Sequence, residues 1–585
     1  RRFESTKSAE KKALKAIQQI ANGEFEDWKI DAIKAEKCRQ FDLEMESNED
    51  KAMILMNAFY NEQDLGDILN YKDKIMAITT DDIKRVAKKY LSDNYLALYI
   101  EKGKPDKNAK IEKPGYKPAE PPIGKESLYA TQFKNLPIGQ MEEKFADYGE
   151  VQIKQLNDRS KMYYTPNKEN NVFQLVVQYG AGEREFPKLG YAAQLMNNAG
   201  IMGAYEPQEL KEELSKLNAT CHVTADDDNL YIIMEGYEAT LPQACQLLSR
   251  QILMPKLDEK QLARLKGSAM GMRQQRKDNV SILNEALRQY MLYGEKSDYI
   301  KELTDKEIYE LQISELTGDI NRASNYEAKV FFTGTLPFDQ VYDILSKNLP
   351  LVANERPSNS PQAKDMMPVT ENTVYFLPNN DAEQAQIRLY IPMQKADKKD
   401  DVLRSAFNQY FGLDFTGIVL NEIREKRSMA YTAYAFVGTQ GIAGKASYLR
   451  GYIGTQNDKA NDALDVLMGL VNDMPKNPER IDNIKSYLRQ AMLTSHPSFR
   501  NKAMELVDLG YRGYTDDPAK ENLPKVDALT FDDIVKFYEE NIKDKPYCIS
   551  IMGNPKNIDL KRLEKFGKVV KLNERKLFNT KDALF

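Results

Sequence analysis

One stretch of the sequence, residues 415–436 (FTGIVLNEIREKRSMAYTAYAF), sets an arginine and a tyrosine beside a change of secondary structure. Its first part mixes apolar and charged residues as a helix does. From Tyr431 onward, aromatic residues alternate with alanine, which predicts a strand. Seven residues of continuous helix rise ~10 Å, so a break at Ser428–Met429 is expected to bring the Arg424 and Tyr431 side chains together. The simpler interpretation is a surface arginine in a charged helix and a tyrosine in a half-buried strand.

Few other residues have the types and spacing of a catalytic or metal site. The two histidines, His222 and His496, have no Cys, His or Glu at ligand spacing, which excludes a histidine-rich metal site. His222 follows Cys221 in an alternating segment, which leaves a nucleophile–histidine pair as an alternative to an ordinary strand. The four cysteines form no CxxC pair and are predicted to be buried thiols: Cys38, Cys221, Cys245 and Cys548.

Length and composition are those of an ordinary globular protein. The 585 residues are 42% hydrophobic and 29% charged, and the length corresponds to about three or four domains at ~150 residues each. The formal net charge of −5 is small for this length, so nothing indicates nucleic acid as a partner. No apolar run approaches the ~20 residues of a membrane span, and the first residues lack the apolar core of a signal peptide.

One short pattern recurs along the chain at intervals of about 225 residues: ITTDDI at 78–83, LTDKEI at 303–308 and LTFDDI at 529–534. In each copy a threonine precedes acidic residues, which predicts an N-cap followed by a helix whose first turn favours negative charge. After each helix a strand ending in glycine is expected, at 95–103, 327–334 and 547–553. Three copies indicate a true repeat. The first signature has only about 77 residues before it, so the first unit is expected to be truncated.

Proline-rich stretches separate these units. Residues 104–123 contain five prolines and residues 353–368 contain three, a composition that does not form helices or central strands. The predicted organisation is a partial domain at 1–103, a linker at 104–149, a domain at 150–352, a linker at 353–368 and a domain at 369–585. Within the units, strand-rich segments are followed by helices. This order predicts the α+β class, with repeated helix layers on antiparallel sheets.

Three parts of the sequence carry a resemblance to a known family. YGAGEREFPKLGYAAQLMNNAG at 179–200 is similar to a strand, glycine-rich turn and catalytic helix. LNEIREKRSMAYTAYAF at 420–436 is similar to an arginine–tyrosine segment, and the three signature helices resemble the closing element of each family domain. On these features the chain resembles the pitrilysin, insulin-degrading and presequence-peptidase family of zinc metallopeptidases, the inverzincins with an HxxEH motif. It looks closest to the end of the second domain and the third and fourth domains of the long members. Ser428 stands where the family usually has glycine.

The chain departs from the family at the zinc motif. Aligned through Gly190 and Ala192, the first histidine of HxxEH falls on Ala193, the glutamate on Met196 and the second histidine on Asn197. Zinc needs imidazole or carboxylate ligands, and the general base must be a carboxylate. The resemblance therefore implies an inactive copy of the catalytic domain, with no zinc bound by this chain and zinc only in the complete enzyme.

The resemblance implies a role in peptide hydrolysis for the chain as a part of such an enzyme. Arg424 and Tyr431 are expected to bind the scissile carbonyl of a peptide substrate, and a zinc-bearing half, upstream in the same protein or on a separate partner chain, is expected to hold the metal. The chain alone is expected to be inactive. A bacterial periplasm or cell envelope is the expected location. The alternative is a non-catalytic scaffold or partner subunit of the same fold, which the missing ligands favour and the retained Arg–Tyr pair opposes.

Overall fold

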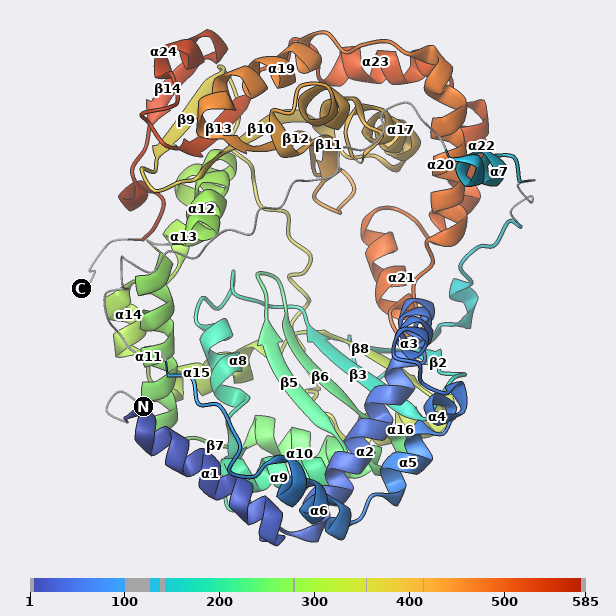
Figure 1. Ribbon diagram of the computed structural model, residues 1–585, viewed down its shortest axis with the longest axis vertical. Helices are drawn as coiled ribbons and strands as arrows, with labels where there is room; N and C mark the ends of the chain where they lie inside the picture. The colour runs from blue at the N-terminus through green and yellow to red at the C-terminus, as the bar shows by residue number, and fades with distance from the viewer. Residues whose placement is uncertain are drawn as a thin grey trace. The chain divides into compact units, whose positions relative to one another are not determined.

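The computed structural model describes residues 5–99, 127–136, 142–276, 279–353, 355–413 and 415–579. The chain divides into two compact units, Arg1–Glu143 and Lys144–Phe585. Figure 1 labels their elements, and each unit is described by itself below.

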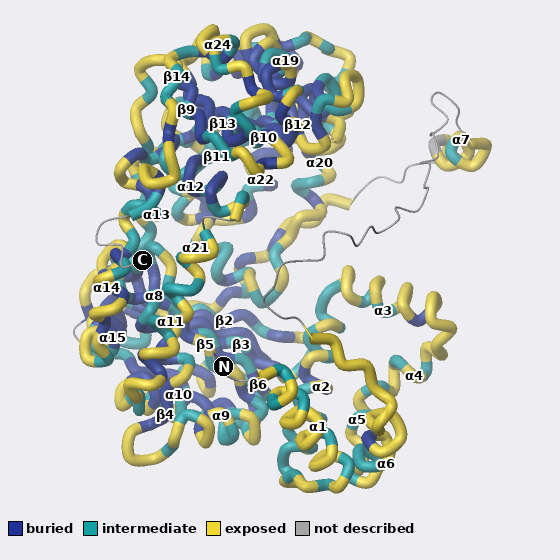
Figure 2. The backbone as a smooth tube through the Cα atoms, turned by 60° about the vertical axis from the view of Figure 1, so that its left-hand side comes forward, coloured by how far each residue is buried: buried dark blue, intermediate teal, exposed yellow. Residues whose placement is uncertain are grey.

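The described part of the first unit is helical. Few of its residues are buried, as the colours of α1 to α6 in Figure 2 show. A further helix, α7, begins at Ser127, whose Oγ accepts the Ala130 N–H at 3.1 Å. It lies within the predicted linker 104–149, of which residues 104–126 are outside the described residues. The helices are α1 (Thr6–Asn22), α2 (Asp27–Glu44), α3 (Asn48–Tyr60), α4 (Leu65–Leu69), α5 (Tyr71–Ala77), α6 (Thr80–Tyr90) and α7 (Leu128–Lys134).

The strand expected at 95–103 is wrong over its described part. Residues 95–99 are irregular, and residues 100–103 lie outside the described residues. A strand is stabilised by a neighbour that pairs with its N–H and C=O groups, and the described residues of this unit contain no strand. The hydroxyls of Tyr95 and Tyr99 instead donate to the Glu10 carboxylate of α1, at 2.9 and 2.6 Å.

All three signature helices begin as predicted. In each, the threonine hydroxyl accepts the N–H of the acidic residue three positions later, and that carboxylate accepts the threonine N–H, which is the reciprocal capping box. The pairs are Thr79 with Asp82 at α6, Thr304 with Glu307 at α14 (Asp305–Glu310), and Thr530 with Asp533 at α23 (Phe531–Asn541). The recurring pattern is therefore a local start signal for a helix.

The second unit contains two six-stranded sheets with the same plan (Figure 1). Read from the edge hairpin inward, the first sheet has the order β5-β6-β3-β8-β2-β1 and the second has the order β11-β12-β10-β13-β9-β14. In both, the hairpin is followed by a central strand (β3 or β10), then by the closing strand (β8 or β13), and then by a strand from the start of the repeat (β2 or β9). The strands of the first are β1 (Gln152–Gln155), β2 (Lys161–Pro166), β3 (Val172–Tyr179), β5 (Thr220–Ala225), β6 (Leu230–Tyr237) and β8 (Ala328–Gly334). Those of the second are β9 (Thr373–Pro378), β10 (Gln384–Lys395), β11 (Ala430–Thr439), β12 (Ala446–Gln456), β13 (Cys548–Gly553) and β14 (Lys568–Lys571).

Strand directions confirm the repeat over five strands. The closing strand pairs antiparallel with the central strand and parallel with the first strand, as β8 does with β3 and β2 and as β13 does with β10 and β9. The sixth strand differs, since β1 precedes β2 and pairs antiparallel while β14 follows β13 and pairs parallel with β9. The predicted sheets are thus mostly antiparallel, with parallel pairs. A strand reached through several helices, unlike one reached by a hairpin, can run in either direction.

Helices cover one face of each sheet, and this confirms the α+β class. Leu175, Val177 and Met234 of the first sheet pack with Leu189 and Leu248 of its helices, and the second sheet forms a matching core. The helices of the first half are α8 (Leu189–Met196), α9 (Pro207–Lys216), α10 (Leu241–Leu253), α11 (Glu259–Gln275), α12 (Val280–Tyr293), α13 (Asp298–Lys301), α14, α15 (Ile313–Ala323) and α16 (Phe338–Asn348). Those of the second are α17 (Asp401–Phe411), α18 (Ile418–Leu420), α19 (Ala460–Asn472), α20 (Ile481–Thr494), α21 (Lys502–Tyr511), α22 (Pro518–Ala528), α23 and α24 (Leu560–Leu563).

Two helices connect the halves of this unit. The apolar face of α12 packs against the second sheet, where Leu283 and Leu287 meet Leu377 and Met552. In the other direction α21 packs on the first sheet, and the Lys502 ammonium contacts the Glu150 carboxylate at 2.6 Å.

Candidate functional site

The stretch around Arg424 is a short helix that widens and stops. Helix α18 passes into a π-helical turn, η6 (Asn421–Glu425), and two backbone bonds close the turn: Ser428 N–H to the Arg424 carbonyl at 2.8 Å and Met429 N–H to the Ile423 carbonyl at 3.0 Å. Single π-turns are frequent at functional sites. The helix ends at Glu425, and residues 426 and 427 form a turn before the break.

Ser428 makes the reversal from helix to strand. Its φ of +49° lies in the left-handed region, which costs a residue with a side chain roughly 1–2 kcal/mol and costs glycine almost nothing. Strand β11 begins two residues later at Ala430. The left-handed backbone therefore explains why the resembled family usually has glycine at this position. The predicted break at Ser428–Met429 is confirmed.

The break places Arg424 and Tyr431 side by side. The Arg424 Cζ lies 5.0 Å from the centre of the Tyr431 ring, which is a cation–π contact, and 5.7 Å from that of Phe415. Tyr431 is 78% exposed and the Arg424 side chain 33% exposed, so both can reach a ligand. Their contact is observed, whereas their binding of a carbonyl stays a prediction.

The charged side chains that neighbour Arg424 in the sequence pair mainly with one another. Glu422 accepts from Lys426 at 2.5 Å and from Arg427 at 2.5 Å, and these two bonds lower the pKa of the Glu422 carboxyl. Arg424 contacts a carboxylate only through Nε, at 3.3 Å from Glu425 among the described residues. Among the described residues, the guanidinium nitrogens at its tip contact no carboxylate.

Of the three positions predicted as a degenerate zinc motif, two lie on α8 and the third is its C-cap, and all three have structural roles. Ala193 and Met196 are 2% and 1% exposed and belong to the core of the first sheet. Asn197 holds the edge strand β5: its Nδ2 donates to the Val223 carbonyl at 2.8 Å, and its Oδ1 accepts the Val223 N–H at 2.7 Å. None of the three offers an imidazole or a carboxylate, so this set does not fit a zinc ion.

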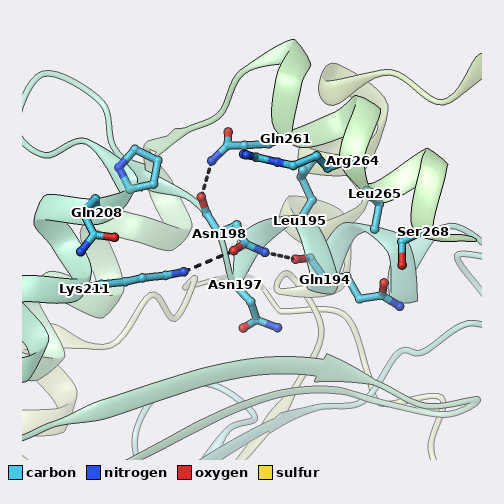
Figure 3. Close-up of a pocket in the computed structure, with 11 residues that line it drawn as sticks. Gln194, Leu195, Asn197, Asn198, Gln208, Lys211, Gln261, Arg264, Leu265 and Ser268 are labelled. Carbon is cyan, nitrogen blue, oxygen red and sulfur yellow. Dashed lines mark hydrogen bonds between the residues drawn. The ribbon is translucent and has the colours of Figure 1, made fainter. Parts of the chain in front are cut away.

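A cavity of about 780 Å³ lies beside this motif, between α8, α9 and α11 (Figure 3). Asn198 is at its centre, donating to the Gln194 carbonyl at 3.3 Å, while its own side-chain oxygen accepts from Lys211 at 3.3 Å. The lining contains amides and two cations but no carboxylate: Gln194, Leu195, Asn197, Asn198, Pro207, Gln208, Lys211, Gln261, Arg264, Leu265 and Ser268. A positively charged lining opposes a divalent cation here.

Nowhere in the part that the structure describes do three His, Cys, Asp or Glu side chains gather in a group able to hold a metal ion. Within the same residues, every helix is too short or too polar to cross a membrane. Cys221 and His222 lie on edge strand β5, and burial raises the pKa of the Cys221 thiol to about 12, which opposes the nucleophile–histidine alternative.

The fold is that of M16 peptidases. A crystal structure of a peptidase M16 inactive domain from Pseudomonas fluorescens is similar over 70% of this chain and 99% of its own length, at 17% identity and a TM-score of 0.55. A mutant of the ferredoxin protease FusC in complex with Arabidopsis ferredoxin is similar over 92% of this chain, at 12% identity and a TM-score of 0.56. The periplasmic protease PqqL from Escherichia coli is similar over 93% of this chain, at 11% identity and a TM-score of 0.53.

Part of the sequence also matches a protein-family model. Residues 324–488 match the model of the peptidase M16 inactive domain, and the resemblance to this peptidase family is thereby confirmed. The chain spans 62% of the length of the FusC chain and 63% of that of PqqL. No curated protein matches the sequence at a significant level.

Sequence reasoning missed two features of this region. The bond from Asn197 to β5 had no sequence signal beyond an amide at a former ligand position. A cluster of arginines and aromatic residues on the second sheet was also missed, because alternation places each residue on a face of its own strand but does not show that the two strands are neighbours: Arg388, Tyr390, Tyr448, Arg450 and Tyr452.

Proposed function

We propose that this chain is the non-catalytic part of a zinc metalloendopeptidase that degrades peptides or small unfolded proteins. Arg424 and Tyr431 bind the scissile carbonyl, and the zinc ion is held by a half that is either upstream in the same protein or on a partner chain. The observation that carries the proposal is the 5.0 Å contact of Arg424 with Tyr431 across the helix-to-strand break. The fold shared with M16 peptidases supports it.

The pair has a defined chemical use. When a peptide carbonyl is attacked, negative charge develops on its oxygen. A guanidinium N–H and a phenol O–H aimed at that oxygen bind the transition state more strongly than the substrate, and this difference raises kcat. The backbones that carry the two donors belong to regular elements, η6 and β11, and the contact between the two side chains holds them near each other.

Substrate class and location follow as further parts of the proposal. FusC is recorded with ferredoxin, which supports protein-derived substrates for a chain of this fold. The sheet edge at β11, which begins beside Tyr431, can pair with an extended peptide through main-chain bonds, so specificity would be loose. PqqL is periplasmic, which supports a location in the cell envelope.

The test uses the enzyme purified together with its zinc-bearing half. We expect Arg424→Ala and Tyr431→Phe each to lower kcat about 10²–10³-fold with a smaller effect on KM, because the bonds form chiefly in the transition state. The double variant should lose less than the product of the two single losses, since both donors share one charge. Arg427→Ala is the matched control, because Arg427 is already paired with Glu422.

Near-normal kcat in both single variants, with the metal content unchanged, would contradict this role and favour a surface pair. If the chain is instead a non-catalytic scaffold, it should still bind its partners, and changing Arg424 or Tyr431 should cause no loss of activity. The chain by itself should cleave no peptide and hold no stoichiometric zinc. One tight zinc per chain, lost when α8 is altered, would contradict the proposed division of labour.

A further inference from the structure

The second sheet packs one face in the core, and its other face is covered by α12 at β9 and β13 but carries polar and aromatic side chains along β10, β11 and β12. Along β10, Ile387, Leu389 and Ile391 enter the core, while Arg388 and Tyr390 point to the other side. Strand register aligns the outward residues in two rows across three strands. One row is Arg388, Tyr452 and Tyr434; the other is Tyr390, Arg450 and Phe436.

Two arginines end a line of stacked rings on this face. Tyr434 and Tyr452 are stacked with centres 5.3 Å apart, and Phe436 tilts against Tyr434 at 5.7 Å. The Arg388 Cζ lies 5.0 Å from the Tyr452 ring, and the Arg450 Cζ lies 4.1 Å from the Phe436 ring. Stacking on rings fixes the guanidinium planes without using their N–H donors.

A cavity of about 250 Å³ lies between these residues and helix α12. Its walls hold three guanidinium groups, those of Arg288, Arg388 and Arg450, and one carboxylate, Glu285. Glu285 accepts from Arg288 Nε at 2.8 and 3.0 Å, which leaves the other two arginines without a carboxylate among the described residues.

The hydrogen bonding of Arg388 is a second observation in favour of a ligand. Its Nε is buried and has no hydrogen-bond acceptor in the described part of the chain. A buried N–H of a charged group without an acceptor is costly, so it calls for an explanation, and an acceptor supplied by a ligand would satisfy it. Tyr390 and Tyr448 add hydroxyls rather than charge, and burial raises the pKa of Tyr390, which keeps it neutral.

We propose that this cavity binds the carboxylate of an aspartate or glutamate side chain of a peptide that lies across the face. The inference rests on the proposed function, since it assigns a preference to the same peptide substrate. The cavity is just below the size of pockets for whole small molecules, roughly 300–1,000 Å³, and suits one side chain of a longer chain. A planar guanidinium fork matches a carboxylate.

A single-stranded nucleic acid is the other anionic ligand that arginines and rings on a sheet can bind. Here the ring faces are already covered, because Tyr434 stacks on Tyr452 and Arg450 covers Phe436. Bases therefore have no free platform, and an acidic side chain fits the observations better.

The experiment is calorimetric titration of the whole chain with two capped peptides. Both are extended, end-blocked and otherwise uncharged, and they differ only in one central residue, Glu or its isostere Gln. We expect the Glu peptide to bind about tenfold more tightly, as one hydrogen-bonded charge predicts. Arg450→Gln, at an exposed side chain, and Arg388→Gln should each reduce this preference to about twofold or less. Arg575→Gln, an exposed arginine of the same half, should keep it.

Each outcome decides a separate point. Equal binding of the two peptides by the unaltered chain overturns the inference and leaves peptide binding intact. A preference for the Glu peptide that survives both arginine substitutions places the carboxylate elsewhere and also overturns it. If neither peptide binds, the proposed function itself is contradicted. Displacement of the Glu peptide by a single-stranded oligonucleotide would assign the cavity to nucleic acid instead.

Discussion

Replacing Asn197 by alanine tests what this side chain does for edge strand β5. The Asn197 amide pairs with both backbone groups of Val223, so these groups point away from β6 and lie along the free edge of β5. Val223 is only 2% exposed, so water cannot easily replace the amide there. The substitution therefore removes two bonds and leaves a buried N–H and C=O without partners.

The size of the effect follows from these two bonds. A hydrogen bond contributes about 1 kcal/mol net, and more where the group left behind is buried. Two bonds give a loss of about 2 kcal/mol, which makes local opening of β5 about thirtyfold more frequent. Asn197→Asp keeps the acceptor for the Val223 N–H and loses the donor, so its rate of β5 opening should lie between those of the unaltered chain and Asn197→Ala.

Hydrogen exchange of the β5 amides measures this opening directly, without assuming that so large a chain unfolds in one step. The control is Asn198→Ala, the same change one residue later, where the side chain makes contacts of 3.3 Å at the surface. Equal exchange of β5 in the Asn197→Ala and unaltered chains, or an equal rise in Asn198→Ala, would show that Asn197 does not hold the strand.

Three other outcomes are expected. Ser428→Gly should raise the unfolding free energy by up to about 1 kcal/mol, because the left-handed φ no longer strains a side chain; a lower melting temperature would contradict this. Bonds from Lys168 and Lys502 lower the pKa of Glu150 to about 2, so its stabilising effect is complete above the usual glutamate pKa and is lost as the pH falls toward 2; in urea titrations the difference between the unaltered chain and Glu150→Gln should vanish there. Burial raises the pKa of the Cys245 thiol to about 12 and that of Cys548 to about 11, so iodoacetamide at neutral pH should label both only after unfolding, and rapid labelling of the folded chain would be evidence against their burial.

The local features of the fold could be predicted from the sequence because they depend on a few neighbouring residues. Thr304 and Glu307 specify a helix start within four residues, and Tyr431 to Phe436 specify a strand by alternation. The parallel pairing of β13 with β9 could not be predicted in this way. It joins segments about 170 residues apart, and no local pattern fixes the direction of a strand that returns after many helices.

The same distinction holds for the candidate site. The break between Arg424 and Tyr431 was predictable because the change from a helical pattern to strand alternation is a local property of the sequence. The Arg388 and Arg450 cluster was not, because alternation tells which residues share a face of one strand but not which strands lie side by side. Residues 95–99 show the limit of local pattern, since a strand-like sequence without a neighbour to pair with stays irregular.

The residues on and next to α8 that align with the zinc motif of the resembled family have structural roles in this chain. A side chain at a ligand position must leave the core and point to an open site, whereas Ala193 and Met196 are packed in the core and contribute to its stability. Asn197 uses its two polar atoms on Val223, so it cannot also face a metal ion. The helix has thus become part of the support for the first sheet. Arg424 on η6 and Tyr431 on β11 lie outside that core, with side chains that are 33% and 78% exposed, and we propose that these two donors, rather than α8, meet the peptide carbonyl.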